Sequence, residues 1–327
     1  MASSRVGRFA TFARASSRAT RGNARARTVV RGASSSPPRD EMRNTKLRVL
    51  CLHSFRTSGE ILREQVRLAG WEETLGDLVE FHVMDAPHPA SGPVPPDVLA
   101  FFPDVPYREW WNATERADPD GSGRKTMTYV GLEESLERVK REFDERGPFD
   151  GVLGFSQGAT LTTILAAKGV ADAWGPFADA SAANASPDAS RPKPKTPPVF
   201  AVCVSGAAAR TREADATYRA ARDANANANA NATVTDASAS ASNSPTPSLH
   251  IIGEADKVVP PPASERAAAR CFVHPVVARH PRGHVVPKLE GDAAETVREF
   301  FLARVRERAD ERTETVLAAG ARTTSAL

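Results

Sequence analysis

Short apolar segments that alternate with helical patterns most restrict how this chain can fold. Most of these segments are hydrophobic at nearly every position, so both faces of each strand would be buried. That pattern is typical of a parallel sheet covered by helices on both faces. The expected strands are 47–53, 79–84, 151–155, 199–204, 249–253 and 275–279, and the expected helices are 58–69, 131–146, 157–168, 264–271 and 292–308. We therefore predict an α/β fold with a mostly parallel central sheet.

One domain, residues 43–310, is expected to contain all of these elements. Two stretches within it, 173–198 and 223–248, are rich in small and polar residues and poor in bulky apolar ones. Such segments bury too little apolar surface to offset the entropy lost on ordering. We predict that both are low-complexity surface insertions and that residues 311–327 form a flexible tail.

The first forty residues differ sharply in charge from the rest of the chain. They hold nine arginines and one acidic residue, Asp40, whereas the whole chain has a net charge of only +3. An Arg- and Ser-rich, acid-poor start is typical of an organelle transit peptide. We predict a disordered transit peptide over residues 1–42 that directs the chain to the chloroplast, with the mitochondrion as the alternative. The other interpretation is a disordered basic tail that carries no targeting signal.

Composition also excludes several classes of protein. Without its basic start the chain is net acidic, which does not suit a nucleic-acid binder. No stretch approaches the roughly 20 consecutive apolar residues of a membrane span. The three cysteines, Cys51, Cys203 and Cys271, are too scattered for a zinc site or a disulfide framework. We expect no metal and no cofactor.

A nucleophile motif follows one of the expected strands. Gly154-Phe155-Ser156-Gln157-Gly158 matches the G-x-S-x-G pattern, in which a serine lies on a tight turn from a strand into a helix. The turn needs neighbours without side chains, because helix and strand approach each other closely. The helix start also places backbone N–H groups where an oxyanion would form. The motif predicts Ser156 as a catalytic nucleophile.

A serine nucleophile needs a base and an acid, which in this kind of fold follow it in the order acid, then histidine, after later strands. Asp256 follows the strand 249–253, and His284 follows the strand 275–279. Glu254 is the rival acid, and His280 could be mistaken for the base. We predict a triad of Ser156, Asp256 and His284.

Two backbone N–H groups are the candidates for binding the oxyanion. One belongs to Gln157, directly after the serine, and the other to Phe55, in the loop after the first strand. Ser54 stands in this loop where a glycine is commoner. The sequence therefore places the expected oxyanion hole between residues 55 and 157.

Five separated blocks carry a resemblance to a known family. They are HSFRTSG at 53–59, DAPHPASG at 85–92, GPFDGVLGFSQGA at 147–159, GEADKVV at 253–259 and GHVVP at 283–287. Together they resemble the FSH family of serine hydrolases, within the α/β-hydrolase superfamily, over about residues 47–305 without the two insertions. The resemblance implies an α/β-hydrolase fold, the triad named above and esterase-like activity. Some relatives are thioesterases.

Residues 86–130 are rich in proline and aromatic side chains. In one interpretation they form a lid or a wall of the acyl pocket, with His53, Phe101, Trp110 and Trp111 as pocket residues. In the other, the aromatic side chains only pack an irregular loop onto the body of the domain.

The expected function is hydrolysis of a carboxylic ester through a Ser-His-Asp triad and an acyl-enzyme. The alternatives are an acyl-thioesterase acting on carrier-bound or CoA-bound chains, and a non-catalytic small-molecule receptor with a hydrolase fold. The expected partner is a small-molecule acyl ester or thioester substrate, with no nucleic acid and no integral membrane association. The acyl length depends on the shape of the pocket and cannot be taken from the fold.

Overall fold

A computed structural model of the chain describes residues 46–117, 125–170, 200–231 and 246–324. The predicted transit peptide, 1–42, and the first predicted insertion, 173–198, lie outside these residues.

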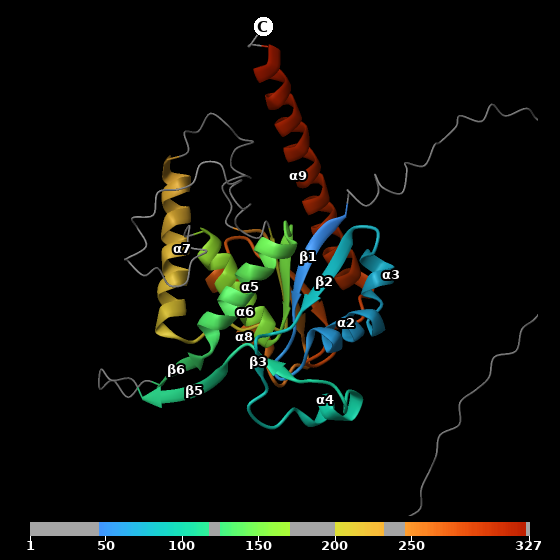
Figure 1. Cartoon of the computed structure of the whole chain (residues 1–327), viewed down its shortest axis with the longest axis vertical. Coiled ribbons are helices and arrows are strands. Elements are labelled where there is room, and N and C mark those ends of the chain that lie inside the picture. Colours follow the sequence, from blue (N-terminus) through green and yellow to red (C-terminus); the bar gives the residue numbers. More distant parts are fainter. Residues whose placement is uncertain (1–45, 118–124, 171–199, 232–245, 325–327) are drawn as a thin grey trace, which may run out of the picture. The chain divides into compact units, whose positions relative to one another are not determined.

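A six-stranded sheet forms the centre of the domain (Figure 1), and all of its strands are parallel. Its order is β10-β9-β8-β7-β1-β2. The strands are β1 (Leu47–Leu52), β2 (Val79–Met84), β7 (Gly151–Phe155), β8 (Phe200–Val204), β9 (Ser248–Gly253) and β10 (Val276–His280). Every residue of β7, β8 and β9 is buried, as their continuous apolar sequence predicts. The predicted α/β class is confirmed.

Helices cover both faces of the sheet, because alternate residues of each strand point to opposite sides. Val49 and Cys51 of β1 belong to a core that includes the helices α2 (Gly59–Leu68), α3 (Trp71–Leu75) and α9 (Gly291–Thr324). Leu50 and Leu52 belong to a second core with α5 (Leu132–Arg146), α6 (Gln157–Val170) and α7 (Arg212–Asn231). α8 (Pro261–Cys271) packs beside α6 and α7.

The strand order places a topological switch point between β1 and β7. From β1 the sheet continues to β2 on one side, and from β7 it continues through β8 to β10 on the other. Loops that leave the carboxyl ends of two such strands diverge, and ligands of open α/β sheets bind in the crevice between them. The fold therefore predicts a site at the carboxyl ends of β1 and β7.

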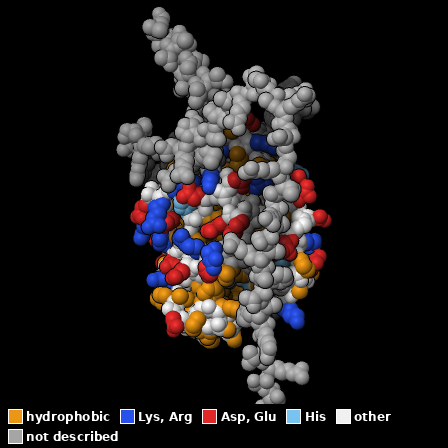
Figure 2. All heavy atoms as spheres, turned by 90° about the vertical axis from the view of Figure 1, so that its right-hand side faces the viewer, with side chains coloured by type: hydrophobic (Ala, Val, Ile, Leu, Met, Phe, Trp, Pro, Cys, Tyr) orange, Lys and Arg blue, Asp and Glu red, His pale blue; other side chains and the backbone are white. Residues whose placement is uncertain are grey.

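An insertion between β2 and α5 lies at this end of the sheet (Figure 1). It contains β3 (His88–Pro89) paired with β4 (Arg108–Glu109), the short helix α4 (Pro96–Phe101), and a hairpin of β5 (Asn112–Ala117) and β6 (Lys125–Val130). No residue of α4 is buried. Figure 2 shows apolar side chains gathered at the lower end of the view, the end at which Figure 1 places α4, and Phe101 of this helix is 80% exposed.

The structure extends two helices into regions predicted to lack fixed structure. α7 continues to Asn231, so the second insertion cannot begin at residue 223. α9 continues to Thr324, through most of the predicted tail over 311–327. Both stretches are rich in alanine, and the tail also holds leucine, arginine and glutamate, which are strong helix formers. The scarcity of bulky apolar residues over 223–231 was a poor guide, because alanine has a high helical propensity without them.

Tyr218 attaches α7, which the sequence analysis missed, to the rest of the domain. Its hydroxyl is hydrogen-bonded to the Thr163 hydroxyl at 2.7 Å and accepts the Ala209 N–H at 3.1 Å. We expect Tyr218→Phe to lower the free energy of unfolding by about 1–3 kcal/mol, because a buried N–H loses its partner. Urea unfolding measures this loss. Tyr129→Phe is the control, because its hydroxyl accepts the N–H of exposed Arg210; we expect a change within about 0.5 kcal/mol. Equal losses in both variants would contradict the assignment.

Candidate active site

Ser156 lies on the tight turn between β7 and α6, in the strand–turn–helix context that its motif predicts. Its backbone has a φ of 55°, a left-handed conformation that is unfavourable for a residue with a side chain. Two hydrogen bonds hold it there: the Ser156 N–H donates to the Val204 carbonyl at 2.9 Å, and the Ser156 carbonyl accepts the Thr160 N–H at 3.0 Å. The strained turn is therefore fixed by β8 on one side and by the first turn of α6 on the other.

The two glycines of the motif allow α6 to begin this close to the sheet. A Cβ at Gly154 would lie 2.2 Å from the Gly158 carbonyl carbon, and a Cβ at Gly158 would lie 2.2 Å from the Leu52 carbonyl oxygen. At both positions a Cβ would overlap with backbone atoms, so any residue other than glycine would force the backbone to move. The start of α6 thus touches the carboxyl end of β1.

His284, in the loop after β10, connects the serine to an acid. Its Nε2 lies 2.9 Å from the Ser156 Oγ, and its Nδ1 lies 2.8 Å from Asp256 Oδ2. An ionised carboxylate only accepts hydrogen bonds, so Nδ1 carries the proton and Nε2 is free to accept the serine hydroxyl proton. The structure therefore brings together the three side chains that the sequence analysis selected.

Asp256 is buried on the turn after β9. Its Oδ1 accepts the N–H groups of Val258 and Val259, both at 2.9 Å. Burial raises the pKa of Asp256, but the hydrogen bonds from His284 and Val259 outweigh it, and the pKa lies below its ordinary value. The carboxylate is thus ionised at neutral pH and faces the imidazole.

Neither rival residue takes part in this chain of contacts. Glu254 is exposed. His280 is buried, and this burial is the main reason why its pKa is lowered. Within the described residues, neither of its ring nitrogens has a hydrogen-bond partner. The structure thus favours Asp256 over Glu254 as the partner of His284.

Two residues that the sequence analysis missed position the turn that carries Asp256 (the acid loop) and the loop that carries His284 (the histidine loop). A Cβ at Gly253 would lie 2.7 Å from the carbonyl oxygens of Arg282 and Gly283, so the loops touch because residue 253 is glycine. The Trp71 indole N–H donates to the Pro287 carbonyl at 2.6 Å and holds the histidine loop against α3. A glycine at the end of a strand, three residues before the acid, is the sequence signal that could have identified the first contact.

The predicted oxyanion donors lie on the two sides of the switch point. Gln157 begins α6, where the first backbone N–H groups have no partner within the helix and carry the positive end of its dipole. Phe55 follows β1 by three residues, in the loop beside the close contact of Gly158 with Leu52. The fold therefore places both loops at one edge, and the pairing of the two N–H groups stays a prediction.

Two of the predicted pocket residues have packing contacts instead. His53 is fully buried, and its Nε2 accepts the Ala86 N–H at 3.0 Å while its Nδ1 lies 2.8 Å from the Ser54 carbonyl oxygen. Burial lowers the pKa of His53 to about 4. The Trp110 indole N–H donates to the His53 carbonyl at 2.8 Å. For these two residues the structure supports the alternative interpretation, in which they pack the irregular segment onto the sheet.

The other two predicted pocket residues differ in exposure. Trp111 is buried and stacks on Tyr129, with 4.8 Å between ring centroids. Phe101 lies on the exposed helix α4. A pocket role for either residue stays a prediction.

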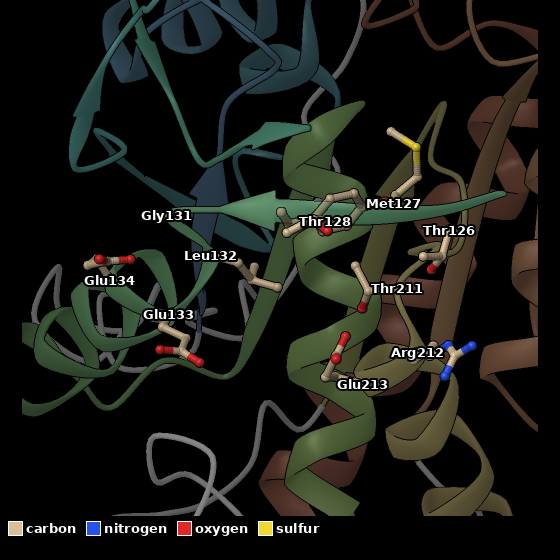
Figure 3. A pocket seen from close by; sticks show the side chains of 11 residues that line it. Thr126, Met127, Thr128, Gly131, Leu132, Glu133, Glu134, Thr211, Arg212 and Glu213 are labelled. Atoms are coloured by element: carbon tan, nitrogen blue, oxygen red, sulfur yellow. The ribbon is translucent and has the colours of Figure 1, made fainter. Parts of the chain in front are cut away.

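A separate cavity of about 370 Å³ opens between β6 and the starts of α5 and α7 (Figure 3). Its lining is mainly polar and includes Thr126, Thr128, Glu133, Thr211 and Glu213. No member of the Ser156, His284 and Asp256 group lines it. We therefore treat it as distinct from the candidate active site.

Among the residues that the structure describes, no cluster of His, Cys, Asp or Glu side chains is placed to hold a metal ion. No helix there has the length and apolar character needed to cross a bilayer.

A serine on a tight turn after a central parallel strand, with an acid and a histidine on loops after later strands, defines the α/β-hydrolase class. Residues 42–295 match the family described as Serine hydrolase (FSH1). The chain belongs to this family, as the five sequence blocks predicted, and it is a serine hydrolase.

Several known proteins are similar to this chain. The chain is 31% identical to Esterase OVCA2 of Mus musculus over 261 residues, which cover 78% of this chain and 94% of that protein. It is 28% identical to Esterase C25G4.2 of Caenorhabditis elegans over 245 residues, covering 75% and 88%. Among solved structures, Zea mays acyl-protein thioesterase 2 is 19% identical, with a TM-score of 0.49, and the match covers 80% of this chain and 94% of that one.

The contact between the acid and histidine loops can be tested with two glycines of different environment. We expect Gly253→Ala to lower the free energy of unfolding by about 1–3 kcal/mol, because its Cβ overlaps two backbone oxygens that must move. Gly283→Ala is the matched control in the facing loop, where the nearest atom to a new Cβ is the Ala255 carbonyl oxygen at 3.4 Å. Urea unfolding of both variants gives the comparison, and a Gly253→Ala variant as stable as Gly283→Ala would contradict it.

Proposed function

We propose that this protein hydrolyses small-molecule carboxylic esters, with Ser156 as nucleophile, His284 as general base and acid, and Asp256 as the orienting acid. The observation that carries the proposal is the 2.9 Å contact between His284 Nε2 and Ser156 Oγ. It places an imidazole nitrogen with a free lone pair within proton-transfer distance of the hydroxyl. The esterase names of the relatives support the same substrate class.

The first half of the reaction forms an acyl-enzyme. As the Ser156 oxygen attacks the ester carbonyl, its proton moves to His284 Nε2, and the carbonyl oxygen becomes an oxyanion that accepts the N–H groups of Phe55 and Gln157. The tetrahedral intermediate then collapses, and the bond to the alcohol breaks as His284 returns the proton to the leaving oxygen. In the second half, water attacks the acyl carbon as one of its protons moves to His284 Nε2. The bond from the acyl carbon to the Ser156 oxygen then breaks as His284 returns the proton to that oxygen, and the carboxylic acid is released.

Asp256 serves the imidazole in two ways. Its Oδ2 accepts the Nδ1 proton, which holds the tautomer that leaves Nε2 as an acceptor, and its negative charge stabilises the imidazolium formed during the reaction. The two N–H groups on its Oδ1 keep the carboxylate oriented. The carboxylate thus keeps its charge throughout the cycle.

Reactivity of the serine is the first test. We expect a fluorophosphonate probe to label the wild-type protein and Ser264→Ala, which changes a buried serine on α8, but not Ser156→Ala.

A panel of acyl esters and acyl thioesters of graded chain length, tested on the protein without residues 1–40, then measures hydrolysis. Turnover by Ser156→Ala should fall by about 10⁶-fold, as when the nucleophile of a triad is removed.

Each other outcome of this panel has a definite meaning. Faster turnover of thioesters than of esters would replace the proposed substrate class by the thioesterase alternative. Wild-type protein that is neither labelled nor active on any member would overturn the proposed catalysis and favour the non-catalytic receptor.

The lowered pKa of Asp256 predicts how stability depends on pH. Its ionised form stabilises the fold fully above the unfolded-state pKa of about 3.9, and this stabilisation is lost as the pH falls through the lower folded-state pKa. We expect the stability advantage of the wild type over Asp256→Asn to shrink below about pH 4. Glu254→Gln, two residues away and exposed, is the control and should show no such trend. Unfolding with urea at several pH values measures it, and an advantage that stays constant down to pH 2 would contradict the assignment.

A further inference from the structure

Both proposed oxyanion donors are attached to one short segment of the insertion, residues 109–111. Glu109 binds Arg56, which directly follows Phe55. The next two residues bind the Gln157 side chain: the Trp110 N–H donates to Gln157 Oε1 at 3.1 Å, and Gln157 Nε2 donates to the Trp111 carbonyl at 2.9 Å. The segment therefore connects the loop after β1 with the start of α6 through side chains and backbone.

The Arg56–Glu109 pair is almost completely buried. The exposed fractions of the two side chains are 10% and 3%, and Arg56 Nε donates to Glu109 Oε2 at 2.8 Å. The second carboxylate oxygen accepts the Ser91 N–H at 3.2 Å and the Ser91 hydroxyl at 2.6 Å. Burial raises the pKa of Glu109, but the bonds from Arg56 and Ser91 outweigh it and hold the pKa below its ordinary value. The charges are paired and hydrogen-bonded, as buried charges must be.

Arg56 also fixes the conformation of the loop itself. Its own backbone has a φ of 51°, which is unfavourable for arginine, and its guanidinium lies 4.5 Å from the centre of the Phe55 ring. Its Nη1 donates to the Pro93 carbonyl at 2.9 Å. The side-chain bonds hold Arg56 in this strained conformation and so fix the residue that directly follows Phe55.

Trp110 is held firmly enough to act as a fixed support. Its indole N–H donates to the His53 carbonyl at 2.8 Å, and its own carbonyl accepts the Ser135 hydroxyl of α5. None of its side chain is exposed. A shift of Glu109 would therefore move the Phe55 loop relative to α6, rather than move α6 with it.

We infer that Glu109 is a positioning residue for catalysis: through Arg56 on one side and Trp110 with Gln157 on the other, it sets the separation of the Phe55 and Gln157 N–H groups that bind the oxyanion. This inference rests on the proposed function. Oxyanion binding depends steeply on donor position, because hydrogen bonds weaken rapidly outside about 2.7–3.1 Å and good alignment. Ground-state binding of the substrate depends much less on these donors.

Glu109→Gln tests the inference, because it keeps the shape of the side chain and removes its charge. We expect kcat for an ester substrate to fall by about 10- to 100-fold with KM changed less than about 3-fold, since the lost interaction acts mainly in the transition state. The affinity for an acyl trifluoromethyl ketone, which forms a tetrahedral oxyanion on the serine, should fall by the same factor as kcat/KM. Loss of packing alone would not lower the ketone affinity and kcat/KM by the same factor.

Glu142→Gln is the matched control. Glu142 lies on α5, has 3% of its side chain exposed like Glu109, and pairs with Arg138 and Arg146 at 2.8 and 3.1 Å. We expect it to cost stability as Glu109→Gln does, while kcat, KM and ketone affinity stay within about 2-fold of wild type. Equal effects of the two variants on kcat and ketone affinity would overturn the inference.

Gly92→Ala tests the same contact without changing a charge, and it decides the question if Glu109→Gln does not fold. A Cβ at residue 92 would lie 2.5 Å from Arg56 Nη1, so the guanidinium must move. We expect a fall in kcat and ketone affinity of the same kind, about 3- to 30-fold. Wild-type values in a folded Gly92→Ala variant would overturn the inference.

Failure of the inference about Glu109 can be distinguished from failure of the proposed function. A wild-type protein that hydrolyses esters and is labelled at Ser156, with Glu109 and Gly92 variants that match it, leaves the function standing and removes the positioning role. A wild-type protein with no reactive serine removes both.

Discussion

The close contact of the start of α6 with the end of β1 is the constraint on which the site depends. Residue 158 can lie against the Leu52 carbonyl only because it has no side chain. The contact is made across neighbouring strands at the switch point, where the chain leaves β1 and β7 in opposite directions. It brings the turn that holds Ser156 beside the loop that holds Phe55. The Ser156 hydroxyl and the backbone of both loops are therefore at one edge of the sheet because of this backbone contact.

A second close contact, between Gly253 and the backbone at Arg282 and Gly283, forms the acid and histidine side of the site. The two contacts are linked by the hydrogen bonds of His284, which reaches from the second to the first. The strained φ of Ser156 is retained because β8 and α6 both hold its backbone. Backbone packing therefore sets the geometry of the candidate site, and the side chains of Ser156, His284 and Asp256 complete it.

Those parts of the site that follow strand ends could be predicted from sequence, and those that depend on contacts between distant loops could not. Ser156, Asp256 and His284 each follow an apolar strand, so the G-x-S-x-G motif and the order of the later strands led to their selection. Glu109 and Arg56 are 53 residues apart, in segments without periodicity, and nothing in either segment indicates their pairing. His53 was named as a pocket residue, but a sequence does not show which way a side chain points, and both ring nitrogens of His53 face backbone groups. The β5–β6 hairpin was missed because both of its strands are rich in polar residues, with the described residues of β5 exposed and most of those of β6 only partly buried. It therefore lacks the continuous apolar runs that marked the strands of the central sheet.

The two insertions illustrate why this arrangement tolerates long changes in sequence. Each connects the end of a helix to the beginning of a strand, α6 to β8 and α7 to β9. In a parallel sheet such connections return to the amino ends of the strands, whereas Ser156, Asp256 and His284 lie beyond the carboxyl ends. The described residues that flank them, Val170 with Phe200 and Asn231 with Thr246, are therefore on the side of the sheet away from the site. Extra residues there add loop-closure entropy, which grows only slowly with length, and they need not disturb the loops that carry the chemistry.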